Sequence, residues 1–181
     1  NDGGLIPLFS GGDGTETNPY IITNWKELYN IRYKVNDGYH YQLDNDLNSS
    51  SDYYHDYVKD AEGNLVDNGK GWEPIGENSS QKQFNGTFNG QGYTISDLEI
   101  ERSSEDDVGL FGYASDATLQ NLTLEATITG EYSVGALVGG ATPDIHIENA
   151  TTTNSTSVTG TSSVGGLVGW IGESFGTIFN C

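Results

Sequence analysis

A glycine-rich motif recurs three times in the second half of the chain and constrains its fold more than any other feature. The copies are Val108–Gly112, Val134–Gly139 and Val164–Gly169. A unit of this size cannot bury its own apolar face, whereas stacked units place the Val, Leu and Ile side chains of successive copies above one another. The spacing therefore predicts a β-solenoid with one continuous core.

Further matching segments follow each copy of the motif. The second strands are Thr118–Leu122, Asp144–Asn149 and Thr177–Cys181, and the third strands are Glu125–Gly130 and Thr156–Gly160. Glycines flank the motif strands, where they permit sharp corners that a β-carbon would obstruct. The predicted coil thus has three strands joined by tight corners. The last coil lacks its third strand, so we expect it to be incomplete.

The residues before the repeats lack the glycine-rich motif and differ in their sequence pattern. Residues 1–22 are loop-like, and residues 23–107 form a predicted capping region in front of the repeats at 108–181. Within the cap, Asn24 and Glu27 make a capping-box pattern at the start of an apolar stripe with helical spacing, which predicts one short helix at about 24–36. A polar stretch without periodicity, at about 48–70, is expected to be a long surface loop.

The repeats resemble the GLUG motif, named for its glycine–leucine–hydrophobic–glycine pattern. GLUG units occur in bacterial and archaeal surface proteins, including large adhesins and the N-terminal region of IgA-specific metallopeptidases. The segments that precede the repeats are also similar to the usual lead-in, namely Gly11–Glu16, Asn18–Ile22, Trp72–Gly76 and Phe84–Ile95. The resemblance covers most of the chain except the 48–70 stretch. It implies an all-β, right-handed parallel β-helix with an N-terminal cap, and it carries no shared catalytic residues.

Charge limits the partners that this chain can bind. Its 181 residues include 7 Lys and Arg against 26 Asp and Glu, which gives a net charge of -19. Such a surface repels the phosphates of nucleic acids and anionic lipid headgroups, so nucleic acid is excluded as a partner. The sequence has no apolar run of 18 residues, and we expect no membrane insertion within this chain. The expected location is extracellular, at a cell surface.

The sequence lacks the residue patterns that polysaccharide lyases and glycoside hydrolases need for catalysis. Polysaccharide lyases need a cationic base or a metal to stabilise an enolate, yet no Lys or Arg occurs between Ser103 and Cys181. Glycoside hydrolases need two carboxylates on one face, whereas Asp106 and Asp107 are adjacent and would point to opposite faces of a strand. The sequence therefore predicts no catalytic residue. A polysaccharide-active enzyme is the least favoured of the functions considered.

Two groups of oxygen-bearing side chains suggest other sites. Asp44, Asp46 and Asn48 lie close together, and hard oxygen ligands at this density can hold calcium, although an ordinary turn explains the same pattern. Calcium is the only cofactor considered. Six asparagines fit the N-x-S/T sequon and are candidate glycosylation sites if the source modifies its surface proteins. They are Asn48, Asn78, Asn85, Asn121, Asn149 and Asn154.

The incomplete last coil suggests an assembly edge. Its residues are Phe175, Ile178, Phe179 and Cys181. An open solenoid end exposes unpaired backbone and apolar side chains, which we expect to be covered by further repeats of the same chain or by another copy. The favoured function is a non-catalytic structural or adhesive module that meets glycans or proteins of a host or a neighbouring cell. The alternative is a subunit that stacks end to end into an extracellular filament or sheath.

Overall fold

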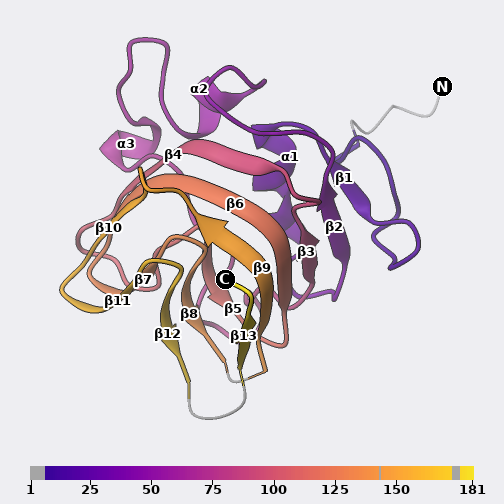
Figure 1. Cartoon of the computed structure of the whole chain (residues 1–181). Coiled ribbons are helices and arrows are strands. Elements are labelled where there is room, and N and C mark those ends of the chain that lie inside the picture. The colour runs from indigo at the N-terminus through magenta and orange to yellow at the C-terminus, as the bar shows by residue number, and fades with distance from the viewer. Residues whose placement is uncertain (1–6, 143, 173–175) are drawn as a thin grey trace.

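The computed structural model of the chain is a parallel β-solenoid, described at residues 7–142, 144–172 and 176–181 (Figure 1). The strands are β1 (Tyr20–Ile22), β2 (His40–Leu43), β3 (Thr87–Asn89), β4 (Thr94–Glu101), β5 (Phe111–Ala114), β6 (Thr118–Thr129), β7 (Tyr132–Gly135), β8 (Val138–Ala141), β9 (His146–Thr152), β10 (Ser157–Thr159), β11 (Ser162–Gly165), β12 (Val168–Ile171) and β13 (Thr177–Phe179). Every pairing between named strands is parallel. The predicted fold class is confirmed.

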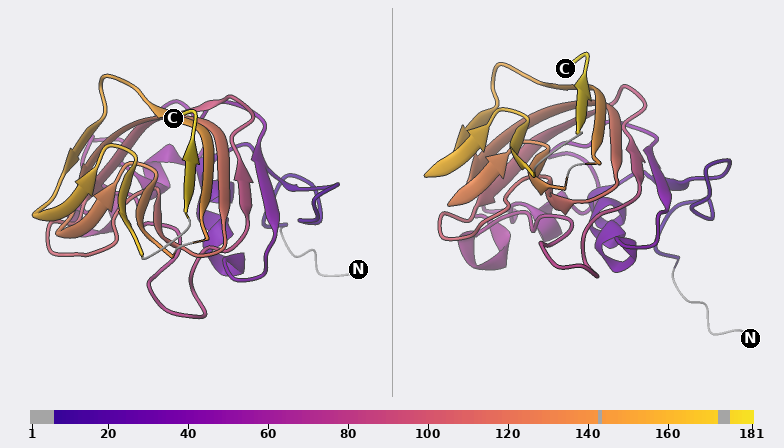
Figure 2. Two further views of the ribbon diagram at one scale, coloured as in Figure 1. Left: turned by 60° about the horizontal axis from the view of Figure 1, so that its bottom comes forward. Right: turned by 90° about the horizontal axis from the view of Figure 1, so that it is seen from below.

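The strands form three parallel sheets. The largest has the order β1-β2-β3-β6-β9-β13, with β4 and β10 also paired to β6, and the others are β11-β7 and β12-β8-β5. Figure 2 shows the strands of the large sheet side by side, with the N-terminal strands at one end of the row and β13 at the other. From β5 to β9 each strand lies in a different sheet from the one before it, as a coil requires.

The register confirms the alignment of the repeats made from the sequence. Val108 bridges Val134, and Val134 pairs with Val164, so the first residues of the three motifs lie in one row. Strand β6 is long enough to serve two segments of the coil, because its first part pairs with β3 and its second part with β4. Asn121 lies between these parts with a φ of 55° and turns the strand at the corner.

One apolar core runs through the cap and the coils. It begins at Phe9 and extends to Ala150, with rows of side chains from successive strands packed on one another. One such row consists of Tyr41, Phe88, Leu119 and Ile147, which are all at most 1% exposed. The interior of the solenoid is therefore filled by stacked side chains of neighbouring coils. This stacking is the source of stability that the repeated motif predicted.

The predicted helix is present but changes character after its first turns. Helix α1 spans Trp25–Asn30 and continues as the 3₁₀ helix η1, Ile31–Lys34. Oδ1 of Asn24 accepts a hydrogen bond from the backbone N–H of Glu27, at 3.0 Å, as the capping pattern predicted. The Glu27 carboxylate, however, accepts from the backbone N–H of Thr23 at 2.7 Å, so the reciprocal bond of the capping box is shifted by one residue.

The 48–70 stretch is more ordered than expected. It contains two one-turn helices, α2 (Tyr54–Tyr57) and α3 (Val66–Gly69), so the cap has more than the single helix predicted. Tyr54 is 4% exposed and its hydroxyl donates to the carbonyl of Asp97, while Val58 is fully buried. The lack of a periodic pattern hid this packing, because the stretch contacts the core through single side chains such as Tyr54, Tyr57 and Val58 and not through a repeating apolar stripe.

Candidate functional site

The outer face of the large sheet carries two rows of polar side chains that cross the strands. The parallel register defines both rows. The first row is His40, Thr87, Thr118, His146 and Thr177, and the second row is Gln42, Asn89, Gln120, Glu148 and Phe179. We call this surface the outer face. The sequence predicted β6, β9 and β13 but neither β3 nor this surface, although the alternation of polar and apolar residues in Thr118–Gln120 was a usable signal.

A cleft lies at the N-terminal end of the outer face. The hairpin of residues 13–19 forms one wall, and it is held to the sheet because the backbone N–H of His40 donates to the carbonyl of Gly14 at 2.9 Å. The cleft has a volume of about 490 Å³, and its floor includes Thr87, Thr118 and Gln120. The arrangement is a polar floor beside a wall that a backbone hydrogen bond holds to the sheet.

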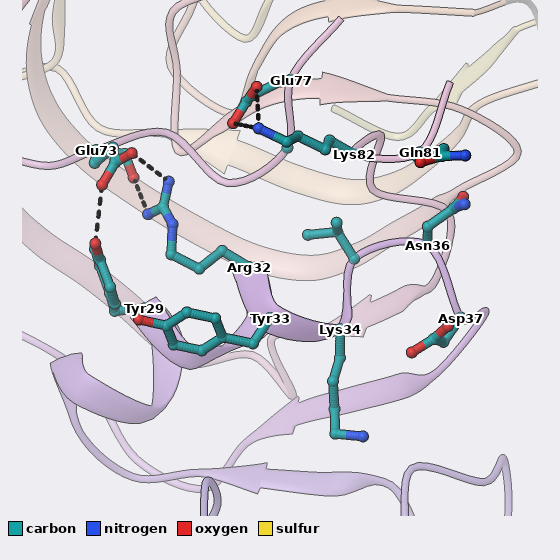
Figure 3. A pocket seen from close by; sticks show the side chains of 12 residues that line it. Tyr29, Arg32, Tyr33, Lys34, Asn36, Asp37, Glu73, Glu77, Gln81 and Lys82 are labelled. Carbon is teal, nitrogen blue, oxygen red and sulfur yellow. Dashed lines mark hydrogen bonds and ion pairs between the residues drawn. The ribbon is translucent and has the colours of Figure 1, made fainter. Parts of the chain in front are cut away.

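A second hollow lies in the cap, between η1 and the segment around Glu73–Lys82, with a volume of about 350 Å³ (Figure 3). Four of its charged side chains form two ion pairs. Arg32 contacts Glu73 at 3.1 Å and donates to two backbone carbonyls, while Lys82 binds Glu77 at 3.0 Å. Burial, followed by its hydrogen bond to Glu73, raises the pKa of Tyr29 to about 12. These contacts fasten the helix to the following segment.

Two of the three residues proposed to hold calcium, Asp46 and Asn48, are hydrogen-bonded within the protein. Oδ1 of Asp46 accepts a bond from the backbone N–H of Thr94 at 2.8 Å. Oδ1 of Asn48 accepts from the backbone N–H and the hydroxyl of Ser50, at 2.8 and 2.6 Å. Asp44 is exposed. Among the residues that the structure describes, no three His, Cys, Asp or Glu side chains form a group that could hold a metal ion.

The six sequons fall into different environments. Asn121 and Asn149 belong to an asparagine ladder, in which Nδ2 of each donates to Oδ1 of the asparagine one coil before, at 3.1 Å. Asn85 is also engaged, because it accepts from the backbone N–H of Gly38 and donates to Asn36. The sites with exposed side chains are Asn78 and Asn154.

The residues of the predicted assembly edge point in different directions. Ile178 pairs with Ile147 and lies in a core row, whereas Phe179 pairs with Glu148 and so lies on the outer face. Both are exposed, at 48% and 61%. Cys181 is a free, exposed cysteine. Phe175 lies outside the described residues.

The two adjacent carboxylates before the first motif are in unequal surroundings. Desolvation by partial burial raises the pKa of Asp107, which also interacts with Asn78 and Ser133, and the neighbouring Asp106 adds to the rise. Asp106 is exposed. Asp107 has a backbone φ of 56° and lies against Gly139 and Gly140 of the next coil. This packing identifies Asp107 as a corner residue between coils.

Comparison with known proteins shows that the chain is similar to parts of longer proteins. No family model matches it, so the resemblance to GLUG repeats gains no support at that level. It is 36% identical over 139 residues to the "Putative Gly-rich membrane protein" of Evansella cellulosilytica, and 36% identical over 161 residues to the "Halomucin" of Haloquadratum walsbyi. The aligned parts are 75% and 87% of this chain but 14% and 2% of those proteins.

A solved structure shares the fold. The chain aligns over 92% of its length with 66% of a crystal structure described as a "putative immunoglobulin A1 protease from Bacteroides ovatus", with a TM-score of 0.54 and 17% identity. This likeness supports the fold. In the described parts of the chain, no helix is long and apolar enough to cross a membrane.

Proposed function

We propose that this chain is a non-catalytic, extracellular structural module, a β-solenoid segment of a longer cell-surface protein. The observation that carries the proposal is the uninterrupted stack of coils. Core rows and the asparagine ladder both run from the cap to the last coil, and each coil is held by its neighbours. Such a stack extends in one dimension, which suits a spacer or support.

The relatives and the charge support the same proposal. The chain matches only small portions of its two sequence relatives, as expected for a module within a large protein, and one of them is named as a membrane protein. A net charge of -19 keeps an exposed module soluble and limits its nonspecific association with other anionic surfaces. In the cap hollow, the ion pairs of Arg32 and Lys82 serve packing, and a substrate would have to break them.

An antibody raised against the purified chain tests the location and the class of function together. We expect it to label intact, unpermeabilised cells of the source organism. Labelling that requires permeabilised cells would contradict the extracellular assignment. In parallel, the purified chain is incubated with acidic and neutral polysaccharides and with proteins. We expect no release of reducing ends or new amino termini, and such a release, if abolished by substitutions in the chain, would show that the module is an enzyme.

Self-association is a second candidate, favoured by the apolar side chains of the last coil. Val164, Trp170 and Ile178 are 44%, 43% and 48% exposed, although the equivalent positions of earlier coils are buried for Val134 and Ile147. A second copy or further coils of a longer chain would bury them equally well. Sedimentation velocity over a range of concentrations distinguishes the two. Concentration-dependent oligomers that disappear in Ile178→Asp support stacking of copies, and a monomer at all concentrations rules it out.

A further inference from the structure

The outer face has hydrogen-bonding groups that the fold does not use. The side chains of Thr87, Thr118 and Gln120 are partly exposed, and in the described part of the chain none of them makes a hydrogen bond to another residue. The adjacent ladder behaves in the opposite way, because Asn121 both donates to Asn89 and accepts from Asn149. The strands are therefore held by other contacts, and Thr87, Thr118 and Gln120 keep their side-chain donors and acceptors available on the outer face.

These three free groups lie on two adjacent strands, because Thr87 pairs with Thr118 and Gln120 is two residues further along β6. The two rows continue on β9 with His146 and Glu148, whose side chains contact each other at 3.4 Å. Adjacent strands are about 4.8 Å apart, so the five strands from β2 to β13 give a face roughly 19 Å long. A ligand that contacts the whole face must be extended and must run across the strands. The hairpin of residues 13–19 limits its position at one end.

The chemistry of the lining indicates an uncharged, hydroxyl-rich ligand. Among the described residues that line the cleft, Glu16 is the only acid, and no Lys or Arg is present. An anionic ligand would find no counter-charge there and would be repelled by the net charge of the chain. Hydroxyl and carboxamide groups each donate and accept hydrogen bonds, which matches the hydroxyl groups of a sugar.

One aromatic ring lies in line with these polar groups. Phe179 follows Glu148 in the second row, and its side chain is 61% exposed on the outer face. A ring in this position offers an apolar surface to the C–H face of a sugar residue, as in the amphipathic contacts that aromatic side chains make. Phe179 lies two strands from Gln120 in the second row, so a ligand that runs across the strands over Gln120 would also reach Phe179.

We propose that the outer face binds a linear, uncharged polysaccharide laid across β2, β3, β6, β9 and β13. A purely structural module needs no such surface, so the proposal goes beyond the function given above, and its failure would leave that function standing. The cleft beside the hairpin would hold one end of the bound segment, and Phe179 would contact the other end.

Native gel electrophoresis tests this, because a chain with a charge of -19 migrates readily unless a polysaccharide in the gel retards it. The probes are hydroxyethylcellulose, dextran and mannan, with alginate and hyaluronan as acidic counterparts. We expect retardation by at least one neutral polymer and by neither acidic one. No retardation by any neutral polymer overturns the proposal, and so does equal retardation by the acidic polymers.

Matched substitutions on one strand then locate the site. Thr118→Val combined with Gln120→Leu removes hydrogen-bonding groups from the cleft floor while preserving side-chain size, and we expect an affinity about tenfold lower. Thr127→Val is the control, since Thr127 is an exposed residue of the same strand outside the cleft. Circular dichroism establishes that both proteins are folded. Equal affinity of the two variants would show that the polymer binds elsewhere and would overturn the assignment.

Discussion

The side-chain amide of Asn149 donates a hydrogen bond to Oδ1 of Asn121, 3.1 Å away and one coil earlier in the stack. Asn121 donates in turn to Asn89, and Asn180 donates to Asn149. The backbone φ of Asn121, Asn149 and Asn180 is 55°, 50° and 53°, in the left-handed region. Asparagine tolerates this conformation better than other residues with a β-carbon, so one residue type satisfies both the corner and the ladder.

Replacing Asn121 tests the value of the ladder. We expect Asn121→Ala to lower the free energy of unfolding by about 2–3 kcal/mol, because two ladder bonds are lost and alanine is strained at this corner. Asn121→Gly loses the same two hydrogen bonds, but glycine adopts the left-handed conformation without strain. The loss in the free energy of unfolding should therefore be about 1 kcal/mol smaller than for Asn121→Ala. Urea denaturation provides the measurement, with Asn154→Ala, at an exposed turn, as the control. A control that loses as much stability as Asn121→Ala would show that the ladder contributes nothing specific.

Two glycines of the repeated motif should respond very differently to a methyl group. A β-carbon on Gly139 would lie 2.3 Å from the backbone carbon of Asp107 and 2.4 Å from the nitrogen of Val108. One on Gly166 would have no atom within 4 Å. We expect Gly139→Ala to destabilise the chain by about 3 kcal/mol and Gly166→Ala to change stability by less than about 0.5 kcal/mol. Thermal unfolding of both variants checks this, and similar melting temperatures would contradict it.

Glu105 should stabilise the fold only above its pKa. Desolvation raises the pKa of Glu105, but hydrogen bonds and charges from Lys70 and Arg102 outweigh it, and the net pKa lies below the ordinary value of 4.5. Its contribution is therefore present above about pH 4.5 and is lost as the pH falls through the lowered folded-state pKa. We expect Glu105→Gln to cost up to about 1 kcal/mol at pH 7, because water screens this partly exposed group, and almost nothing at the acidic end of the range.

Asp107, two residues away, should show the opposite sign. Desolvation raises its pKa above 3.8, so ionisation weakens the folded state as the pH rises past that value. Asp107→Asn should therefore be more stable than the parent at pH 7 and equal to it at low pH. Unfolding free energies of both variants across the pH range provide the test. Parallel profiles for Glu105→Gln and Asp107→Asn would refute this account of the two carboxylates.

The turn around Asp46 should not depend on calcium. Its carboxylate already caps the backbone N–H of Thr94, and Asn48 is bonded to Ser50. We expect the melting temperature to be the same in excess calcium and in a chelator. A rise with calcium that disappears in Asp46→Asn would instead establish the calcium site suggested by the sequence, since ligand binding to the folded state raises its stability.

Glycosylation, if the host supports it, should be selective among the six sequons. Asn78 and Asn154 are exposed, whereas the Nδ2 groups of Asn121 and Asn149 are donors in the ladder. We expect intact mass and peptide mapping, after expression in a glycosylating host, to find glycans on the two exposed asparagines. Modification at Asn121 in folded protein would contradict the ladder as a stable structure.

The parallel stack follows from the order and spacing of residues along the chain. Three copies of one motif specify which residues lie above one another, as the alignment of Val108, Val134 and Val164 shows, because each copy can bury its apolar face only on the next. Asn121 and Asn149, at equivalent positions of successive repeats, also fit a corner, since asparagine adopts a positive φ more readily than most residues. These features depend on local spacing and residue type, which are visible in a single chain.

Which polar side chains are hydrogen-bonded and which are free becomes visible only in the folded chain. Asn121 and Gln120 are neighbours in the sequence, yet one is bonded on both sides and the other projects from the outer face. Tyr54 and Val58 likewise have no periodic partners, and only the folded cap shows them buried. The reason is physical: hydrogen-bond partners and burial depend on residues from distant coils, and no local pattern records where those coils come to lie.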